Sequence, residues 1–244
     1  MSSSYSAWFR KGIEPGTIIT LDQPVSSQWK ILEKLNEHDY QVNEEVHHEY
    51  GFRSIATAKI LCCDPLNRAK KALMRIYTQV PHRKTEMDDA ETRGRQATTY
   101  NPRELVAYRD LTQKRSSNTP KLLGYKIGTQ GPSGLVPGGF IIWLVWEIVP
   151  GLRLGDSDGA GPFLALESYE REQIRAVFID ALLKLVENGW YPTVPRARSL
   201  VWHRETQTLY FIGRFSKAGK PKRPVFGPKL IATFELAEPE SSRK

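Results

Sequence analysis

The side chains with the clearest capacity for chemistry are three arginines near the C-terminal end. Arg196 and Arg198 are separated by one residue, and Arg214 follows in a later segment. A guanidinium group presents planar N–H donors that match carboxylate and phosphate oxygens. The three arginines could together supply positive charge opposite an acidic ligand, or they could be surface residues of a basic protein. His203 and Tyr210 could carry protons, although His203 falls in an expected turn that points away from the cleft, so that exposure to solvent is the favoured interpretation.

Three further charged residues have spacing or context that could place them in a binding site. Arg75 and Glu104 could bind an anion in a cleft, or could form an ion pair that docks a helix onto a sheet. Glu147 ends an apolar segment and could make a ligand contact or act as a general base, or could be exposed at a sheet edge. We therefore take Arg75, Glu104, Glu147, Arg196, Arg198 and Arg214 as candidate ligand-binding residues.

Metal and redox chemistry is not indicated. The two cysteines, Cys62 and Cys63, are adjacent and cannot build a disulfide framework, which is typical of a reduced intracellular chain. The histidines form no His-x-x-x-His pair and no cluster with cysteine, so no zinc site is predicted. They are His38, His47, His48, His82 and His203. We expect no cofactor and a cytoplasmic location.

The composition predicts a globular protein with a basic surface. The 244 residues are 40% hydrophobic and 25% charged, with a formal charge of +8. That charge could attract nucleic acid, anionic lipid or an acidic ligand, or could serve solubility, and the spread of basic residues along the chain favours solubility. The densest basic run, from Lys217 to Arg223, lacks interleaved aromatics, so the sequence does not favour nucleic-acid binding. No run of about 18 apolar residues occurs, so no membrane insertion is expected.

The elements that must position these residues can be predicted from apolar patterning. Residues 1–28 are rich in Ser, Pro and Gly and are expected to form an arm. Strands are expected at 29–35, 54–63 and 71–77, and the turn residues Asp64 to Asn67 predict that the last two form a hairpin. A helix should begin near Asn101 and run to about Lys114.

The second half of the chain carries the strongest periodic signal. Strands are expected at 120–125 and 139–149, with a break at Pro150-Gly151. A long helix follows, with Ser168 as its expected N-cap and Gly189 as its left-handed C-terminal residue. Its apolar stripe has helical spacing and consists of Ile174, Val177, Phe178, Ala181, Leu182, Leu185 and Val186. A hairpin formed by 199–202 and 208–212 comes after it.

This order of elements resembles the core of protein kinases and, more specifically, small kinase-like proteins found in fungi. Ala72-Leu-Met-Arg-Ile76 is similar to the Val-Ala-Ile-Lys motif of the third kinase strand, and Glu104 opens the helix that would supply its ion-pair partner. Leu144 to Leu154 resembles the hinge of those fungal proteins, and Arg196 to Trp202 resembles the end of their catalytic loop. The resemblance implies a truncated two-lobe α+β fold, in which an antiparallel sheet with one helix precedes a small helical remnant with a hairpin.

The same resemblance exposes departures at the positions that transfer phosphate. Aligning Tyr191 to Ser199 with the catalytic loop places Val194 at the catalytic aspartate and Ser199 at the metal-binding asparagine. Gly213 stands where a second metal-binding aspartate is expected, and no glycine-rich loop precedes Val42. Phosphoryl transfer needs these groups together. The resemblance therefore implies that the chain is not a working kinase, and it places the three arginines on segments that face the cleft.

The resemblance divides the chain into an arm (1–28), an N-lobe (29–150), a truncated C-lobe (151–215) and a basic, then acidic tail (216–244). Two functions from different classes are compatible with this organisation. The first is a pseudokinase that binds a small-molecule ligand or a protein partner. The second is a repurposed, cofactor-independent enzyme, such as a cyclase or pericyclase, that acts on an apolar metabolite of a fungal secondary-metabolite pathway. The sequence leaves the ligand and the oligomeric state open.

Overall fold

The computed structural model describes residues 8–219 and 227–237, and the chain divides into two compact units. The first unit contains the chain up to Pro102 together with Leu122–Ile148, and the second contains Arg103–Lys121 and the chain from Val149 onward. The helix after Pro102, which we expected in the first lobe, therefore belongs to the second unit. Parts of the expected basic and acidic tail, at 220–226 and 238–244, lie outside the described residues.

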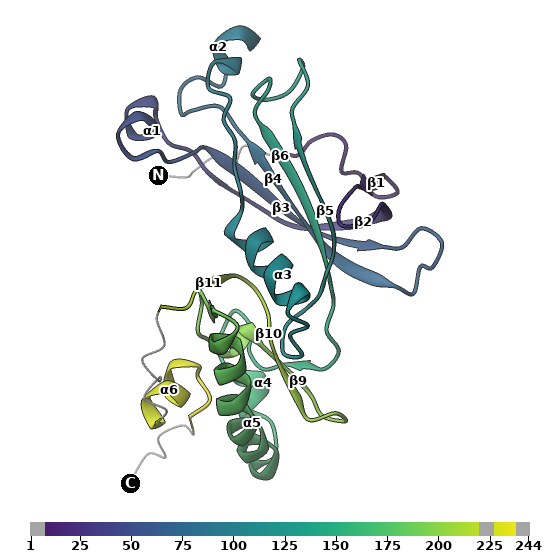
Figure 1. Cartoon of the computed structure of the whole chain (residues 1–244), viewed down its shortest axis with the longest axis vertical. Coiled ribbons are helices and arrows are strands. Elements are labelled where there is room, and N and C mark those ends of the chain that lie inside the picture. Colours follow the sequence, from purple (N-terminus) through teal and green to yellow (C-terminus); the bar gives the residue numbers. More distant parts are fainter. Residues whose placement is uncertain (1–7, 220–226, 238–244) are drawn as a thin grey trace. The chain divides into compact units, whose positions relative to one another are not determined.

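The first unit is built on a six-stranded antiparallel sheet in the order β1-β2-β3-β4-β6-β5 (Figure 1). Its strands are β1 (Ile18–Leu21), β2 (Ser27–Tyr40), β3 (Ile55–Cys63), β4 (Lys71–Gln79), β5 (Leu122–Thr129) and β6 (Phe140–Glu147). Sequence-adjacent strands pair, except that β6 lies between β4 and β5. Two short helices, α1 (Glu44–Tyr50) and α2 (Ala90–Gly94), occupy connections at one end of the sheet.

The predicted hairpin between β3 and β4 is confirmed. The two strands pair without interruption from Ile55 and Gln79 to Cys63 and Lys71. The Asp64 carboxylate accepts the Leu66 N–H at 3.0 Å, which is the side-chain-to-backbone bond that favours Asp at a turn.

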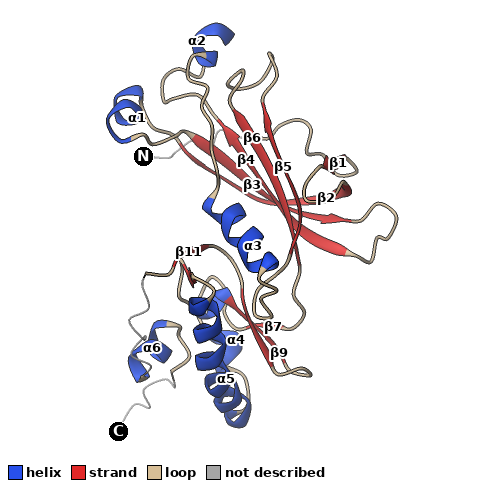
Figure 2. Cartoon of the chain, viewed as in Figure 1, coloured by secondary structure: helices blue, strands red, loops and turns tan. Residues whose placement is uncertain are grey.

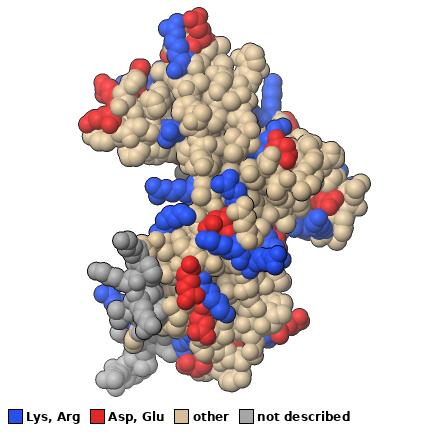
Figure 3. Space-filling view, in the orientation of Figure 1, with Lys and Arg blue, Asp and Glu red and all other residues tan. Residues whose placement is uncertain are grey.

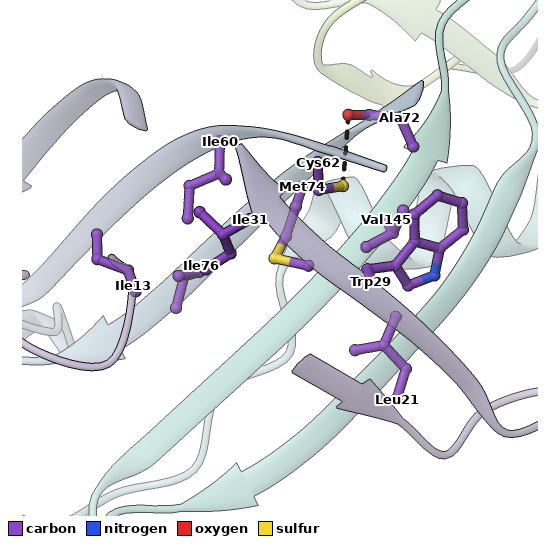
Figure 4. Close-up of a cluster of buried hydrophobic side chains, with 10 residues drawn as sticks. All are labelled: Ile13, Leu21, Trp29, Ile31, Ile60, Cys62, Ala72, Met74, Ile76 and Val145. Atoms are coloured by element: carbon purple, nitrogen blue, oxygen red, sulfur yellow. Dashed lines mark hydrogen bonds between the residues drawn. The ribbon is translucent and has the colours of Figure 1, made fainter. Parts of the chain in front are cut away.

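One face of this sheet carries the apolar core shown in Figure 4. Burial alternates along β3, as expected for a strand whose successive side chains point to opposite faces. Ile13 and Leu21, from the segment expected as an arm, pack here beside Trp29, which is 3% exposed. The described part of that segment thus contributes an edge strand and core side chains. The Cys62 thiol lies in the same core and donates to the Ala72 carbonyl.

The second unit combines helices with two small sheets, in the orders β10-β9-β7 and β11-β8 (Figure 2). Its strands are β7 (Leu152–Arg153), β8 (Trp190–Pro192), β9 (Leu200–His203), β10 (Thr208–Phe211) and β11 (Phe215–Lys217). Its helices are α3 (Arg103–Gln113), α4 (Gly161–Leu164), α5 (Ser168–Glu187), the 3-10 turn η1 (Ala197–Ser199) and α6 (Pro228–Thr233). The predicted β9-β10 hairpin is confirmed.

Helix α5 agrees with its predicted apolar stripe. The buried members of that stripe are Ile174, Phe178, Ala181, Leu182 and Leu185. Gly189 adopts a φ of +85° and its N–H donates to the Val186 carbonyl, as expected for a left-handed residue after a helix. The predicted N-cap is wrong by one residue: Glu167 occupies that position, and its side chain makes no capping bond.

Polar contacts from α3 explain why it belongs to the second unit. Asp110 accepts hydrogen bonds from the Trp190 indole at 2.6 Å and from the Lys114 ammonium at 2.9 Å. Burial raises the pKa of Asp110, but these two bonds outweigh burial and the net pKa is lowered. The Tyr108 hydroxyl also donates to the Gly213 carbonyl at 3.0 Å. Trp190 and Gly213 are far from α3 in sequence, so local patterning could not reveal these two contacts.

Candidate anion-binding site

The structure brings the loop 193–199, which we call the arginine loop, beside the segment 212–214. Two backbone hydrogen bonds join them: Thr193 N–H donates to the Arg214 carbonyl, and Ile212 N–H donates to the Ser199 carbonyl, each at 2.8 Å. Pairing of β8 with β11 and of β9 with β10 extends this connection on both sides. The arginine loop is therefore held at both ends by backbone bonds.

Val194, Ser199 and Gly213, at the positions assigned to phosphate transfer, all lie in this pair of segments. Val194 is 37% exposed, whereas Ser199 is buried. Gly213 has a φ of +100°, and an added Cβ would meet no atom within 4 Å. Small or apolar groups thus stand in each position, and an acid at 213 would have room but would require a left-handed backbone.

The positive side chains that we predicted as ligand contacts are carried by the same two segments. Arg196, Arg198 and Arg214 are all exposed. Arg153 on β7 adds a fourth guanidinium group, whose Nε donates to the Arg198 carbonyl at 2.7 Å. Partial burial and the nearby Arg198 lower the pKa of Arg153, while Asp156 opposes them. Sequence patterning could not select Arg153, because a two-residue strand has no periodicity.

One carboxylate from a distant part of the chain contacts the arginine loop. Glu235 Oε1 lies 3.6 Å from an Arg196 guanidinium nitrogen, and Oε2 accepts the Ala197 N–H at 3.3 Å. A single acidic group is thus bound by a cation and a backbone donor of adjacent residues, which is a recurrent arrangement for anions. Sequence reasoning missed Glu235, since nothing in its local sequence relates it to a loop almost forty residues earlier.

The remaining predicted contacts are carried by other elements. Arg75 on β4 lies with its guanidinium carbon 5.6 Å from the centre of the Trp146 ring in the first unit. Glu147 pairs with Ala72, whereas Arg75 pairs with Leu144, so an uninterrupted register places Arg75 and Glu147 on opposite faces of the sheet.

Glu104, the third of these predicted contacts, lies on α3 in the second unit and is 3% exposed. It is thus assigned to a different unit from Arg75 and Glu147.

His203 and Tyr210 belong to the β9-β10 hairpin. A His203 ring nitrogen lies 2.6 Å from the Thr206 hydroxyl, as expected for a residue tied into a turn. Tyr210 lines a hollow of about 400 Å³ with Asp180 and Lys184 of α5. Neither residue is placed in the arginine loop or the segment 212–214.

An ionic network on a largely buried carboxylate of the second unit involves residues that sequence reasoning did not select. Glu170 on α5 accepts two hydrogen bonds from Arg204, at 2.7 and 2.5 Å, and one from the Trp202 indole at 2.9 Å. The Glu170 side chain is 10% exposed. The hydrogen bonds from Arg204 lower the pKa of Glu170 against the effect of burial. This network fixes the hairpin to the first turn of α5.

The described residues carry a mixed surface charge and no cluster of metal ligands. Basic and acidic side chains are interspersed on the face drawn in Figure 3. Within residues 8–219 and 227–237, no three His, Cys, Asp or Glu side chains gather into a cluster that could hold a metal ion. In the same ranges, no helix has both the length and the apolar character needed to cross a bilayer.

Comparison with known proteins gives similarity only among solved structures. No family model and no curated protein matches the sequence. The chain is similar to the Cydia pomonella granulovirus kinase PK-1, with 17% identity and a TM-score of 0.45 over 79% of this chain and 56% of that one. It is also similar to vaccinia related kinase 3, with 17% identity and a TM-score of 0.37 over 83% of this chain and 51% of that one. The chain thus spans about half the length of each of these kinases.

Proposed function

We propose that this chain is a kinase-like protein that does not transfer phosphate and that binds an acidic ligand or protein partner through the arginine loop. The observation that carries the proposal is the character of the two joined segments. They combine Val194, Ser199 and Gly213 with three exposed arginines. The order of strands and helices is also the order on which the resemblance to kinases rests.

Electrostatics favour anion binding over magnesium-dependent chemistry at this loop. Magnesium is held by oxygen ligands, chiefly carboxylates, and kinases place two such side chains beside the phosphates. Here the residues from Tyr191 to Trp202 and from Ile212 to Lys217 include no acid. The guanidinium groups instead create a positive field, which repels a divalent cation and attracts a carboxylate or phosphate.

The geometry around Arg198 also favours binding of an anion. Arg153 Nε donates to the Arg198 carbonyl at 2.7 Å, and the charge of Arg198, after burial, lowers the pKa of Arg153. Like charges held near one another are stabilised by an anion that bridges them. A bound acid would therefore relieve repulsion as well as form hydrogen bonds.

We favour binding over a cyclase-type reaction because the hollow beside α5 is lined mainly by polar groups, among them Asp180, Lys184 and Gln207. An apolar metabolite is better matched by hydrophobic and aromatic lining.

Two measurements test the proposed function. First, the purified chain is incubated with radiolabelled ATP and magnesium, and we expect no saturable transfer to itself or to a generic acceptor protein. Second, thermal unfolding is followed with citrate and with inorganic phosphate, both without magnesium. We expect the anions to raise the melting temperature of the wild type but not of Arg198→Ala/Arg214→Ala.

The matched control is Arg68→Ala/Arg95→Ala, which removes the same charge from exposed positions of the first unit. It should respond to anions as the wild type does. Saturable phosphate transfer, or an equal anion response in both double variants, would contradict the proposal.

A further inference from the structure

The segment 227–237, which contains α6, is attached to the second unit by two buried side chains. Phe234 and Leu236 are both 0% exposed. The Phe234 ring lies 4.8 Å from the Phe178 ring of α5 and 6.2 Å from the Phe211 ring of β10, at angles typical of edge-to-face contacts. Arg175 Nε donates to the Leu236 carbonyl at 2.7 Å. Both side chains are therefore buried in the second unit, and Phe234 packs against aromatic rings of α5 and β10.

Glu235, between these two anchors, is turned toward the arginine loop. Its φ of +60° is in the left-handed region, which is unusual for a residue other than glycine. Such a conformation persists where the surroundings hold it in place. Here Phe234 and Leu236 fix the backbone on both sides, while the carboxylate reaches Arg196 and the Ala197 N–H.

We propose that the Arg196 guanidinium and the Ala197 N–H form a docking site for an acidic peptide segment of a partner protein, and that Glu235 fills this site in the unbound chain. This inference rests on the proposed binding function of the arginine loop and names the class of ligand. The occupant that the structure shows is an acidic residue flanked by two buried apolar residues. A partner that replaces it should offer the same pattern, because the acid alone would leave both buried positions empty.

The segment 227–237 is held in place both by the Arg196–Glu235 ion pair and by its buried side chains. The Arg196 and Glu235 side chains are 58% and 31% exposed, so solvent screens their attraction. Phe234 has lost all contact with water, and the hydrophobic effect makes it the stronger anchor. Loss of Phe234 should therefore free the site, whereas loss of Glu235 alone should weaken occupancy more modestly.

A peptide supplied in trans tests this competition. A fluorescein-labelled peptide with the sequence of residues 227–237 is titrated with the full chain, and binding is followed by fluorescence anisotropy. We expect Phe234→Ala/Glu235→Ala to bind the peptide at least about tenfold more tightly than the wild type, because its own segment no longer competes. Adding Arg196→Ala to that variant should weaken its peptide binding about threefold, which is the share that a solvent-exposed ion pair contributes.

Two controls accompany the titration. Lys229→Ala, an exposed change on α6, should leave the peptide affinity at the wild-type value. The single variant Glu235→Gln keeps both anchors and changes only the charge, so it preserves a test if the double variant fails to fold. We expect it to bind the peptide about threefold more tightly than the wild type, since a surface ion pair contributes little.

Each contrary outcome has a distinct meaning. Equal affinity of all variants would overturn the inference while leaving the anion response of Arg198 and Arg214 intact. Peptide affinity that is unchanged on adding Arg196→Ala would show an apolar groove without an acid site, and would also overturn it. Displacement of the peptide by millimolar acetate or inorganic phosphate would assign the site to small anions rather than to a partner segment.

Discussion

Replacing Glu170 by glutamine should destabilise the second unit, because one carboxylate there holds two elements together. Glu170 accepts hydrogen bonds from Trp202 on β9 and from Arg204 in the turn that follows β9. Glutamine has nearly the same shape but carries no charge. Its amide has a single acceptor oxygen, so at least one of the Arg204 bonds is lost.

The size of the effect follows from exposure. Breaking a fully buried ion pair costs about 3–5 kcal/mol because it strands a buried charge. Here the Arg204 side chain is 73% exposed and can return to water, while Glu170 is 10% exposed. The loss should therefore approach that of one charge-assisted hydrogen bond, about 1.5–3 kcal/mol in the free energy of unfolding.

The assay is urea unfolding at pH 7, monitored by circular dichroism and tryptophan fluorescence. Glu172→Gln is the matched control, because Glu172 lies on the same helix and pairs with Arg175 but is 68% exposed. Its cost should stay below about 0.5 kcal/mol. If Glu170→Gln were as mild as Glu172→Gln, the reasoning that the buried carboxylate anchors the hairpin would be refuted.

The pH dependence provides a second test of the same network. The folded pKa of Glu170 is lowered from its ordinary value of 4.5, chiefly by the Arg204 hydrogen bonds. Its contribution to stability is therefore fully present above that value and is lost as the pH falls through the folded pKa. The difference between wild type and Glu170→Gln should be constant from pH 7 to 5 and shrink below 4.5.

Three further outcomes are expected. Gly151→Ala should lower the free energy of unfolding by roughly 2–4 kcal/mol, because φ is +121° and the new Cβ would meet a β9 carbonyl oxygen. Gly213→Ala, whose Cβ would enter open space, should cost about 1–2 kcal/mol in the same urea assay. Burial raises the pKa of Cys62 to about 12, so thiol labelling at pH 8 should be at least about 100-fold slower in the native chain than in urea, and equal rates would contradict the burial. Burial, and after it the charge of His47, lower the pKa of His82, so the unfolded chain binds a proton more readily than the folded one. The free energy of unfolding should therefore fall by up to about 1.4 kcal/mol per pH unit below pH 6.5. His82→Gln should flatten that slope in chemical denaturation.

Predictions that rest on neighbouring residues agree with the structure. The turn residues after Cys63 define a hairpin because Asp64 bonds its own backbone two residues on. The stripe from Ile174 to Leu185 defines α5 because residues three and four apart share a helix face. Both signals are contained in a short window of sequence.

What could not be predicted depends on partners far apart in the chain. Glu170 and Arg204 are separated by 34 residues, and nothing in either segment indicates the other. The same holds for Asp110 with Trp190, which assigns α3 to the second unit, and for Glu235 with the arginine loop. The three arginines of the site could be selected because residue type alone indicated a role for them, but Glu235, the acid that contacts Arg196, could not.

The assignment of α3 has a consequence for how the chain is made. The polypeptide passes from the first unit to the second after Pro102, returns at Leu122 and leaves again after Ile148. As the chain emerges from the ribosome, α3 appears before β6, the strand that lies between β4 and β5, and well before its own partner Trp190. During synthesis, the sheet can therefore be completed only after the residues beyond 140 have been made. Until Trp190 has also been made, the amphipathic helix α3 lacks this partner. No single cut in the sequence separates the two units, so dissecting this protein into halves requires rejoining segments rather than simple truncation.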